Sequence, residues 1–383
     1  MSSSMKSTYE QRQKWRTQHL QSADPIITQI PKIELHVHIE GTMSPSLRWT
    51  LSQRNSIPLT CGTSKVPLTS LQEVEEAYTQ IRGRIGAGSA EASKSFTFFE
   101  IYYGGFELLQ TEEDFYDLAM GYFERVEGMD VRYCEVFFDP QGHTRRGIAL
   151  DVVMKGFKRA QEKAAKELNV KSQWIMCFLR DMSPESAIQQ YEAALPYKDM
   201  IIGIGLDSDE LDRPPSLFYE VFQRAKKDKF RLTAHCDFNQ KNTLEHIRQV
   251  CENLGGSGAE RIDHGMNAAD SDDLTEIIKK KGIGMTICPC AYIRHAAEDE
   301  VFLRIRKLFD AGNKITIASD DPAYMEDNWV MHGLYMVRDK CKFTDAEMVK
   351  LQRNAVEICW ARDEDKARLS KELDEFEEAY ISR

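Results

Sequence analysis

Apolar and polar positions follow a repeating pattern over most of this chain. Short apolar runs, typical of buried strands, are each followed by a longer stretch with apolar residues at three- and four-residue spacing, which predicts a helix. The predicted strands are residues 33–38, 131–138, 172–179, 200–206, 230–235, 261–264, 283–288 and 314–319. The predicted helices between the later strands are 149–168, 184–194, 216–227, 244–254, 273–280 and 299–311.

This alternation predicts an α/β fold, a (β/α)8 TIM-type barrel. A doubly wound open sheet is the alternative. That fold usually carries a glycine-rich phosphate turn after its first strand, and the sequence HVHIEG at this place is not such a turn.

Additional helices are expected around the barrel, within one domain of residues 1–383. A helical insertion at about 44–130 follows the first strand, with helices at 46–53, 71–78, 95–109 and 112–127 and a glycine-rich loop at 83–89. Residues 1–24 are expected to form a solvated helical lead-in, and residues 344–383 one or two charged helices.

Composition and charge limit the partners. The 383 residues carry a net charge of −11, which disfavours nucleic acid or an anionic membrane and suits a small neutral or weakly basic substrate. Nine scattered cysteines and a polar start without an apolar leader segment predict free thiols in a reducing compartment. We expect a cytoplasmic protein, with the nucleus as the alternative, that is a monomer or a homodimer.

Histidine and aspartate follow four of the predicted strands. His36 and His38 are two positions apart, so a strand directs both imidazoles to the same side. His235, His264 and the pair Asp320–Asp321 end three later strands. Because the carboxyl ends of barrel strands meet at one face, these groups predict a metal site suited to zinc, with iron or manganese as alternatives.

Longer segments show a family resemblance over residues 31 to about 324. They read PKIELHVHIEGTMSPSL, FFEIYYGGFELL, EDFYDLA, EVFFDPQGHTRRGI, CFLRDMSPE, GIGLDSDELDRPP, RIDHG, ICP and SDDPAY. On these segments the chain resembles the adenosine/adenine deaminase family of the amidohydrolase superfamily, and most closely its adenine deaminase branch.

The resemblance implies roles for individual residues. It implies one zinc ion per chain, with ligands His36, His38, His235 and Asp320. It makes His264 the group that polarises a metal-bound water, and Asp321 a hydrogen-bond partner of that water or of the purine N7. It also places Ser208, Asp209 and Asp139 at the substrate, Asp139 where the adenine branch closes the pocket around a free base.

One position departs from the family pattern. The family has His-Ala-Gly-Glu after the fifth strand, and that Glu protonates the purine N1, whereas this chain has His-Cys-Asp-Phe with Phe238 in the Glu position. Asp237 is the first candidate substitute, ahead of Cys236 and Glu245, although it could instead cap the following helix. The motif Cys-Pro-x-Ser-Asn is also changed, to CPCAY.

These features predict a zinc-dependent hydrolytic deaminase of adenine or an N6-substituted aminopurine, in which metal-bound hydroxide attacks the amine-bearing ring carbon. Two alternatives remain open. One is a zinc hydrolase of a different heterocycle with a changed acid or base, and the other is a non-catalytic purine-binding relative.

Overall fold

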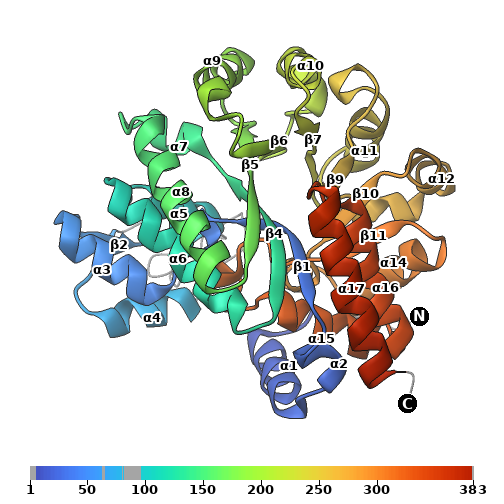
Figure 1. The fold of residues 1–383 in the computed structure, drawn as a ribbon. Coiled ribbons are helices and arrows are strands. Elements are labelled where there is room, and N and C mark those ends of the chain that lie inside the picture. Colours follow the sequence, from blue (N-terminus) through green and yellow to red (C-terminus); the bar gives the residue numbers. More distant parts are fainter. Residues whose placement is uncertain (1–5, 63–64, 80, 82–95, 382–383) are drawn as a thin grey trace.

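A barrel of parallel strands forms the centre of the computed structural model, which describes residues 6–62, 65–79, 81 and 96–381 (Figure 1). One row of strands pairs in the order β1 (Lys32–His38), β4 (Val131–Phe138), β5 (Lys171–Leu179), β6 (Ile201–Asp207) and β7 (Arg231–Leu232). A second row pairs in the order β11 (Lys314–Ile317), β10 (Gly284–Ile287), β9 (Arg261–His264) and β8 (His235–Cys236).

The two rows join at both ends, which closes the barrel. Segments β7 and β8 are halves of one strand, and the two residues between them bond to both neighbouring strands. The Thr233 N–H donates to the Ile204 carbonyl of β6, and the Asp263 N–H of β9 donates to the Ala234 carbonyl, each at 3.0 Å. At the other end Val37 bridges to Asp320 in parallel register. The eight predicted strands and the predicted barrel are therefore confirmed.

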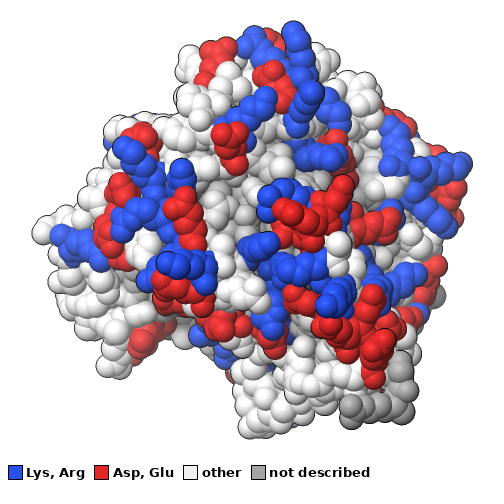
Figure 2. All heavy atoms as spheres, in the orientation of Figure 1, with Lys and Arg blue, Asp and Glu red and all other residues white. Residues whose placement is uncertain are grey.

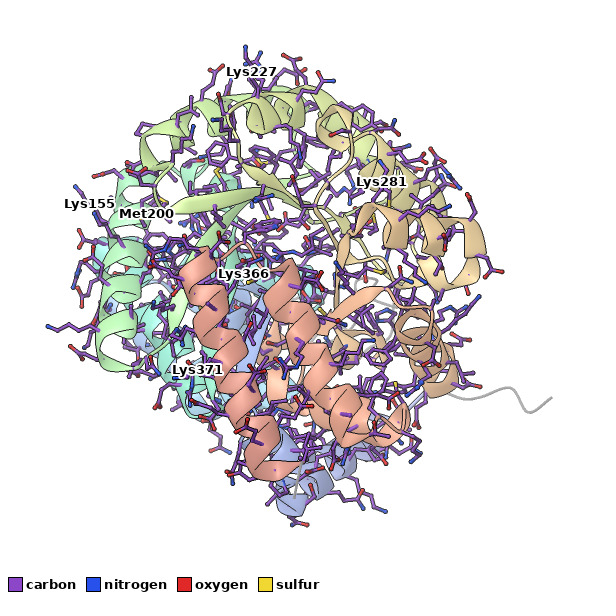
Figure 3. The ribbon with its side chains drawn as sticks, turned by 45° about the vertical axis from the view of Figure 1, so that its right-hand side comes forward. Lys155, Met200, Lys227, Lys281, Lys366 and Lys371 are labelled. Atoms are coloured by element: carbon purple, nitrogen blue, oxygen red, sulfur yellow. The ribbon has the colours of Figure 1, made fainter. Side chains whose placement is uncertain are left out.

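Amphipathic helices follow the strands and surround the barrel (Figure 1). They are α8 (Leu150–Glu167), α9 (Pro184–Ala194), α10 (Tyr219–Lys227), α11 (Thr243–Glu252), α12 (Asp272–Lys281) and α14 (Glu298–Asp310). Each turns apolar residues inward, and charged residues such as Lys155 and Lys227 project from the outer surfaces of α8 and α10 (Figure 3).

The insertion after β1 contains the predicted helices and one hairpin that was not predicted. The helices are α3 (Pro45–Asn55), α4 (Leu71–Thr79), α5 (Phe98–Phe106) and α6 (Glu112–Glu127). The antiparallel hairpin β2 (Leu59–Cys61) and β3 (Val66–Leu68) has strands too short to show an alternating pattern. The glycine-rich stretch 83–89 lies outside the described residues. Four further helices were also missed: α2 (Pro25–Thr28), α7 (Pro140–Thr144), α13 (Pro289–Tyr292) and α15 (Val330–Lys340).

The terminal helices pack on the barrel. The tail forms α16 (Asp345–Ile358) and α17 (Asp363–Tyr380), and α16 contacts β1 and β11. Trp360, between these two helices, packs with Phe137, Ile175 and Cys177 inside the barrel. A Cβ at Gly203 would lie 2.3 Å from the Trp360 ring, so only glycine fits in β6 at this point.

The N-terminal segment forms α1 (Tyr9–Ser22) and α2 (Pro25–Thr28). None of the residues of α1 is buried, and Arg12 and Arg16 pair with Glu326 and Asp327 in the segment after β11. Basic and acidic side chains are interspersed on the face shown in Figure 2. In the described part of the chain, no helix has the length and apolar character needed to cross a membrane.

Candidate metal and active site

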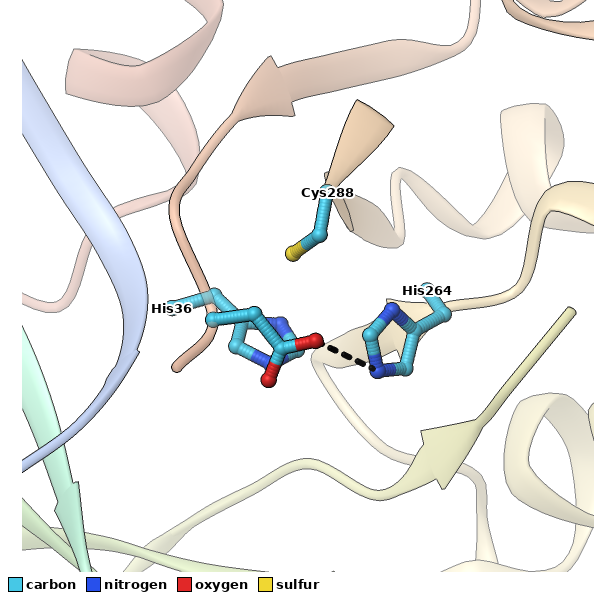
Figure 4. Close-up of side chains that lie close together, drawn as sticks. His36, His264 and Cys288 are labelled. Atoms are coloured by element: carbon cyan, nitrogen blue, oxygen red, sulfur yellow. Dashed lines mark ion pairs between the residues drawn. The ribbon is translucent and has the colours of Figure 1, made fainter. Parts of the chain in front are cut away.

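Four buried imidazoles and one carboxylate converge at the carboxyl ends of the barrel strands. The Nε2 atoms of His38 and His235 lie 3.0 Å apart. The Asp320 Oδ1 atom lies 3.5 Å from the His36 Nε2 atom and 3.7 Å from the His38 Nε2 atom. The Oδ2 atom of Asp320 lies 3.9 Å from the His264 Nε2 atom, and Figure 4 shows His36, His264 and Cys288 around this point.

The backbone places Asp320 beside the two histidines of β1. The His38 N–H donates to the Asp320 carbonyl at 2.9 Å, and the Asp320 N–H donates to the His36 carbonyl at 3.0 Å. These bonds attach the end of β11 to β1. Asp320 and His264 both adopt the left-handed region, with φ of 66° and 65°, a strained conformation that concentrates at functional sites.

Asp263 supports the imidazoles of His36 and His235, directly or through a threonine hydroxyl. Its Oδ1 and Oδ2 atoms accept hydrogen bonds from the hydroxyls of Thr286, at 3.0 Å, and Thr233, at 2.7 Å. The Thr286 Oγ1 atom lies 2.8 Å from the His36 Nδ1 atom, and the Asp263 Oδ2 atom lies 3.5 Å from the His235 Nδ1 atom. Such contacts from residues behind the ligands orient metal-binding imidazoles.

Two further carboxyl groups, of Asp207 and Asp139, lie near His38 on the side of its Nδ1 atom. The Asp207 Oδ2 atom lies 3.4 Å from the His38 Nδ1 atom, and Asp139 accepts a hydrogen bond from the Tyr102 hydroxyl at 2.6 Å. Burial and the nearby Glu40 raise the pKa of Asp139 to about 6, and burial and Asp139 raise that of Asp207 well above its usual range. One ligand atom of each of Asp139, Asp207 and His38 lies within 4.8 Å of the other two, and two carboxyl groups at such a distance favour sharing one proton.

The donor set fits a divalent metal ion. Burial lowers the pKa values of His36 and His235, and it lowers that of His38 to about 4. These imidazoles therefore stay neutral and can act as ligands. The buried His36 Nε2 atom has no hydrogen-bond partner among the described residues. Two ligand atoms of a tetrahedral zinc site lie about 3.3 Å apart, which matches the nitrogen and oxygen separations here. His36, His38 and His235 each offer one nitrogen, and these three atoms lie within 4.8 Å of one another.

Asp321 is buried beside this cluster. Its Oδ1 atom has no hydrogen-bond partner among the described residues, and burial together with Asp320 raises its pKa well above the usual range. A Cβ at Gly41 would lie 1.9 Å from this oxygen, so the turn after β1 requires glycine to leave room for the carboxyl group.

Ser208 and Asp209 follow β6 but lie differently. The Ser208 hydroxyl is 2.6 Å from the Tyr103 hydroxyl of α5 and is partly buried. Asp209 forms an ion pair with Arg213 at 2.8 Å, and its side chain is 39% exposed. The structure therefore brings Ser208 against the insertion and leaves Asp209 paired near the surface.

Asp237 and Phe238 lie in the short segment after β8. The Asp237 Oδ1 atom accepts from the Phe238 N–H at 2.6 Å, and the Asp237 N–H donates to Glu210 at 2.8 Å. The N-cap of α11 is Asn242, so Asp237 does not cap that helix. Phe238 is buried, and its ring centroid lies 5.6 Å from that of Tyr292.

A model of the adenosine deaminase family matches residues 31–376. The chain belongs to the adenosine deaminase family. An uncharacterised deaminase of Schizosaccharomyces pombe is 41% identical over 355 residues, which cover 92% of this chain and 98% of that protein. The adenine deaminase of Rhodospirillum rubrum is 34% identical, over 90% of this chain and 96% of its own length. The crystal structure of an adenine deaminase from Arthrobacter aurescens is 31% identical, matches with a TM-score of 0.79, and covers 91% of this chain and 99% of that one.

The predicted family is thus confirmed, and the chain is a deaminase-type enzyme that hydrolyses C–N bonds. Sequence reasoning missed the residues that contact these imidazoles from behind, which are Asp263, Asp207, Thr286 and Tyr292. The Tyr292 hydroxyl lies 2.8 Å from the His264 Nδ1 atom. A signal was present for Asp207, because it ends β6 as the candidate histidines end their strands. Asp263, Thr286 and Tyr292 acquire their roles only through contacts between strands and loops.

Proposed function

We propose that this deaminase-family chain is a zinc-dependent hydrolase that removes the exocyclic amine from adenine or from an N6-substituted adenine. The observation that carries the proposal is the convergence of the buried His36, His38, His235 and Asp320 side chains at one end of the barrel. Similarity to adenine deaminases over nine tenths of the chain supports the purine substrate.

The proposed ligands of the metal are these four residues. When bound, a zinc ion would lower the pKa of a bound water to about 7 and so supply a nucleophile at neutral pH. His264 and Asp321, which both lie close to Asp320, would orient the attacking water and the purine ring. Asp139 and Ser208 would contact the substrate, together with the neighbouring Asp209.

Asp237 is the proposed donor of the proton to the ring nitrogen. It is 8% exposed and adjoins Phe238, which cannot transfer a proton. Its Oδ1 atom accepts a hydrogen bond from the Phe238 backbone, so the carboxyl group is held in one orientation. A positioned general acid contributes about 10²–10⁴-fold to the rate.

A second candidate function follows from Phe238 itself. Because an aromatic side chain stands at the position where the family resemblance expects a glutamate, the chemistry could be hydrolysis of a ring whose leaving group needs no ring protonation. Pterins and other aminopurines enter the test as rings other than adenine.

The test uses zinc-loaded protein with adenine, adenosine, AMP, N6-substituted adenines, other aminopurines and pterins. Ultraviolet change and released amine are followed together, with His235→Ala as the blank. We expect turnover of adenine or an N6-substituted adenine, and a loss of about 10²-fold or more in Asp237→Asn. Asp272→Asn, at a side chain that is 94% exposed, is the matched control.

Turnover of only a pterin or another ring would favour the second candidate. Absence of turnover on the whole panel, with zinc bound and purines still binding, would overturn both candidates in favour of a non-catalytic purine-binding protein.

A further inference from the structure

The imidazoles of the candidate metal site differ in the residue that their Nδ1 atoms contact. His36 and His235 are backed by Thr286 and Asp263, whereas the Nδ1 atom of His264 lies 2.8 Å from the hydroxyl of Tyr292. The residue in contact with Nδ1 decides which ring nitrogen carries the proton of a neutral imidazole, and hence which nitrogen is free to bind a metal.

For His36 and His235 the contacts specify a proton on Nδ1. The Thr286 hydroxyl hydrogen is used on Asp263, so its oxygen can only accept from the His36 Nδ1–H. The His235 Nδ1 atom lies 3.5 Å from an Asp263 oxygen, which has no hydrogen to offer, so this close contact favours a proton on Nδ1. Both imidazoles therefore present a bare Nε2 atom, the form that binds a metal ion.

For His264 the contacts specify the opposite form. The Tyr292 oxygen already accepts a hydrogen bond from the Cys288 N–H at 3.1 Å. Among the described residues, the other hydrogen bond of this hydroxyl is with the His264 Nδ1 atom, which is therefore the partner that can accept the phenol hydrogen. Burial raises the pKa of Tyr292 well above its usual range, so the phenol keeps this hydrogen.

We infer that Tyr292 is a positioning residue that holds His264 as the Nε2–H tautomer, facing Asp320 as a proton donor and not as a metal ligand. This distinguishes His264 from the other imidazoles, although His264 also lies in a cluster with His36, Cys288 and Asp320 that has the spacing of a metal site. The His264 Nε2 atom lies 3.9 Å from the Asp320 Oδ2 atom.

Neighbouring residues hold the phenol in place. Tyr292 ends the short helix α13 and is fully buried. Its ring packs against Phe238, with centroids 5.6 Å apart, and Phe238 is in turn covered by the Arg304 guanidinium at 5.6 Å. Phe238 therefore supports Tyr292, the residue that orients His264. A charged side chain at position 238 would not provide this packing.

The test is Tyr292→Phe, which keeps the ring and removes only the hydroxyl. Zinc-loaded protein labelled with ¹⁵N-histidine is studied by long-range ¹H–¹⁵N NMR, and the His264→Gln spectrum assigns the His264 signals. We expect a proton on Nε2 of His264 in the unchanged protein, and a mixed or Nδ1-protonated form in Tyr292→Phe. We expect turnover to fall about 10–100-fold, with zinc content unchanged.

Tyr133→Phe is the matched control, because it removes another buried phenol, one that donates to Glu135 at 3.0 Å. It should leave the His264 tautomer unchanged. A proton on Nδ1 of His264 in the unchanged protein, or an unaltered tautomer in Tyr292→Phe, would overturn the inference.

The effect on turnover rests on the proposed function, but the tautomer does not. If no purine is turned over and the tautomer still responds to Tyr292→Phe, the proposed function fails and the role of Tyr292 stands.

Discussion

The Nε2 atoms of His38 and His235 lie 3.0 Å apart, although the two residues are separated by 197 positions in the chain. Two neutral imidazoles whose Nδ1 atoms are protonated would direct their lone pairs at each other at this distance. A cation bound between the two Nε2 atoms removes this repulsion, and it explains why the two imidazoles lie so close together.

Removal of the metal should therefore destabilise the protein. Because a ligand that binds only the folded state stabilises it, chelation with dipicolinate is expected to lower Tm, and added zinc to restore it. Calorimetry with metal analysis measures both effects. His235→Asn should lose the bound zinc, while His19→Asn, on α1, should retain it. Equal Tm values with and without zinc would contradict this prediction.

Asp263 is expected to control metal affinity without binding the metal. Asp263→Asn removes an oxygen that accepts from Thr233 or Thr286 and changes the support of His36 and His235. We expect zinc affinity to fall about 10–100-fold, measured by competition with a chromogenic chelator. The control is Asp272→Asn, and the same affinity in both variants would argue against the role.

The helix α1 should stabilise the segment that follows Asp321. Arg12 pairs at 2.6 Å with Glu326, whose side chain is 7% exposed, and Glu326 and Asp327 are consecutive residues with left-handed φ of 63° and 56°. Arg12→Ala leaves Glu326 short of a partner, with an expected loss of about 3 kcal/mol in the free energy of unfolding and reduced turnover. Urea unfolding measures the loss. Lys14→Ala, exposed on the same helix, should show none.

Lys32 should give the stability of the protein a distinctive pH dependence. Burial lowers the pKa of Lys32 from 10.5 to about 7, and the charge of Asp130 opposes this only in part. Between these values the unfolded chain holds a proton that the folded chain releases, so the free energy of unfolding rises with pH by up to about 1.4 kcal/mol per unit. The destabilisation is fully present below pH 7 and disappears as pH approaches 10.5.

Lys32→Met should remove this pH dependence. The difference in unfolding free energy between Lys32→Met and the unchanged protein is expected to favour the variant most at low pH and to shrink as pH rises. Urea unfolding at about pH 6.5, 8 and 9.5 measures it. Lys280→Met, at a side chain that is 72% exposed, is the control, and parallel pH profiles for both variants would refute the prediction.

Phe238→Glu alone should not create an adenine deaminase of higher activity. The Phe238 ring lies against Tyr292 and below the Arg304 guanidinium, so a carboxylate here is expected to pair with Arg304 and to loosen Tyr292. Adenine turnover and Tm should both fall below those of Phe238→Leu, which keeps an apolar side chain. A gain of adenine turnover of about tenfold or more would show that residue 238 faces the reacting ring.

The sequence by itself determined the barrel, the family and the residues that end its strands. Hydrophobic periodicity is a local property, so each strand and most helices could be read without knowing their neighbours. His36, His38, His235, His264, Asp320 and Asp321 could be named because parallel barrel strands bring their carboxyl ends to one face.

Only the tertiary structure decided how these groups are held. The hydrogen bonds of Asp320 to His36 and His38, the support from Asp263, and the contact of Tyr292 with His264 all join segments far apart in the chain. Asp209 illustrates the same limit, because its motif gives no sign of the ion pair that its carboxylate forms with Arg213. Side-chain partners depend on the spacing and twist of neighbouring strands and on loop conformation, and periodicity in one segment carries no information about those.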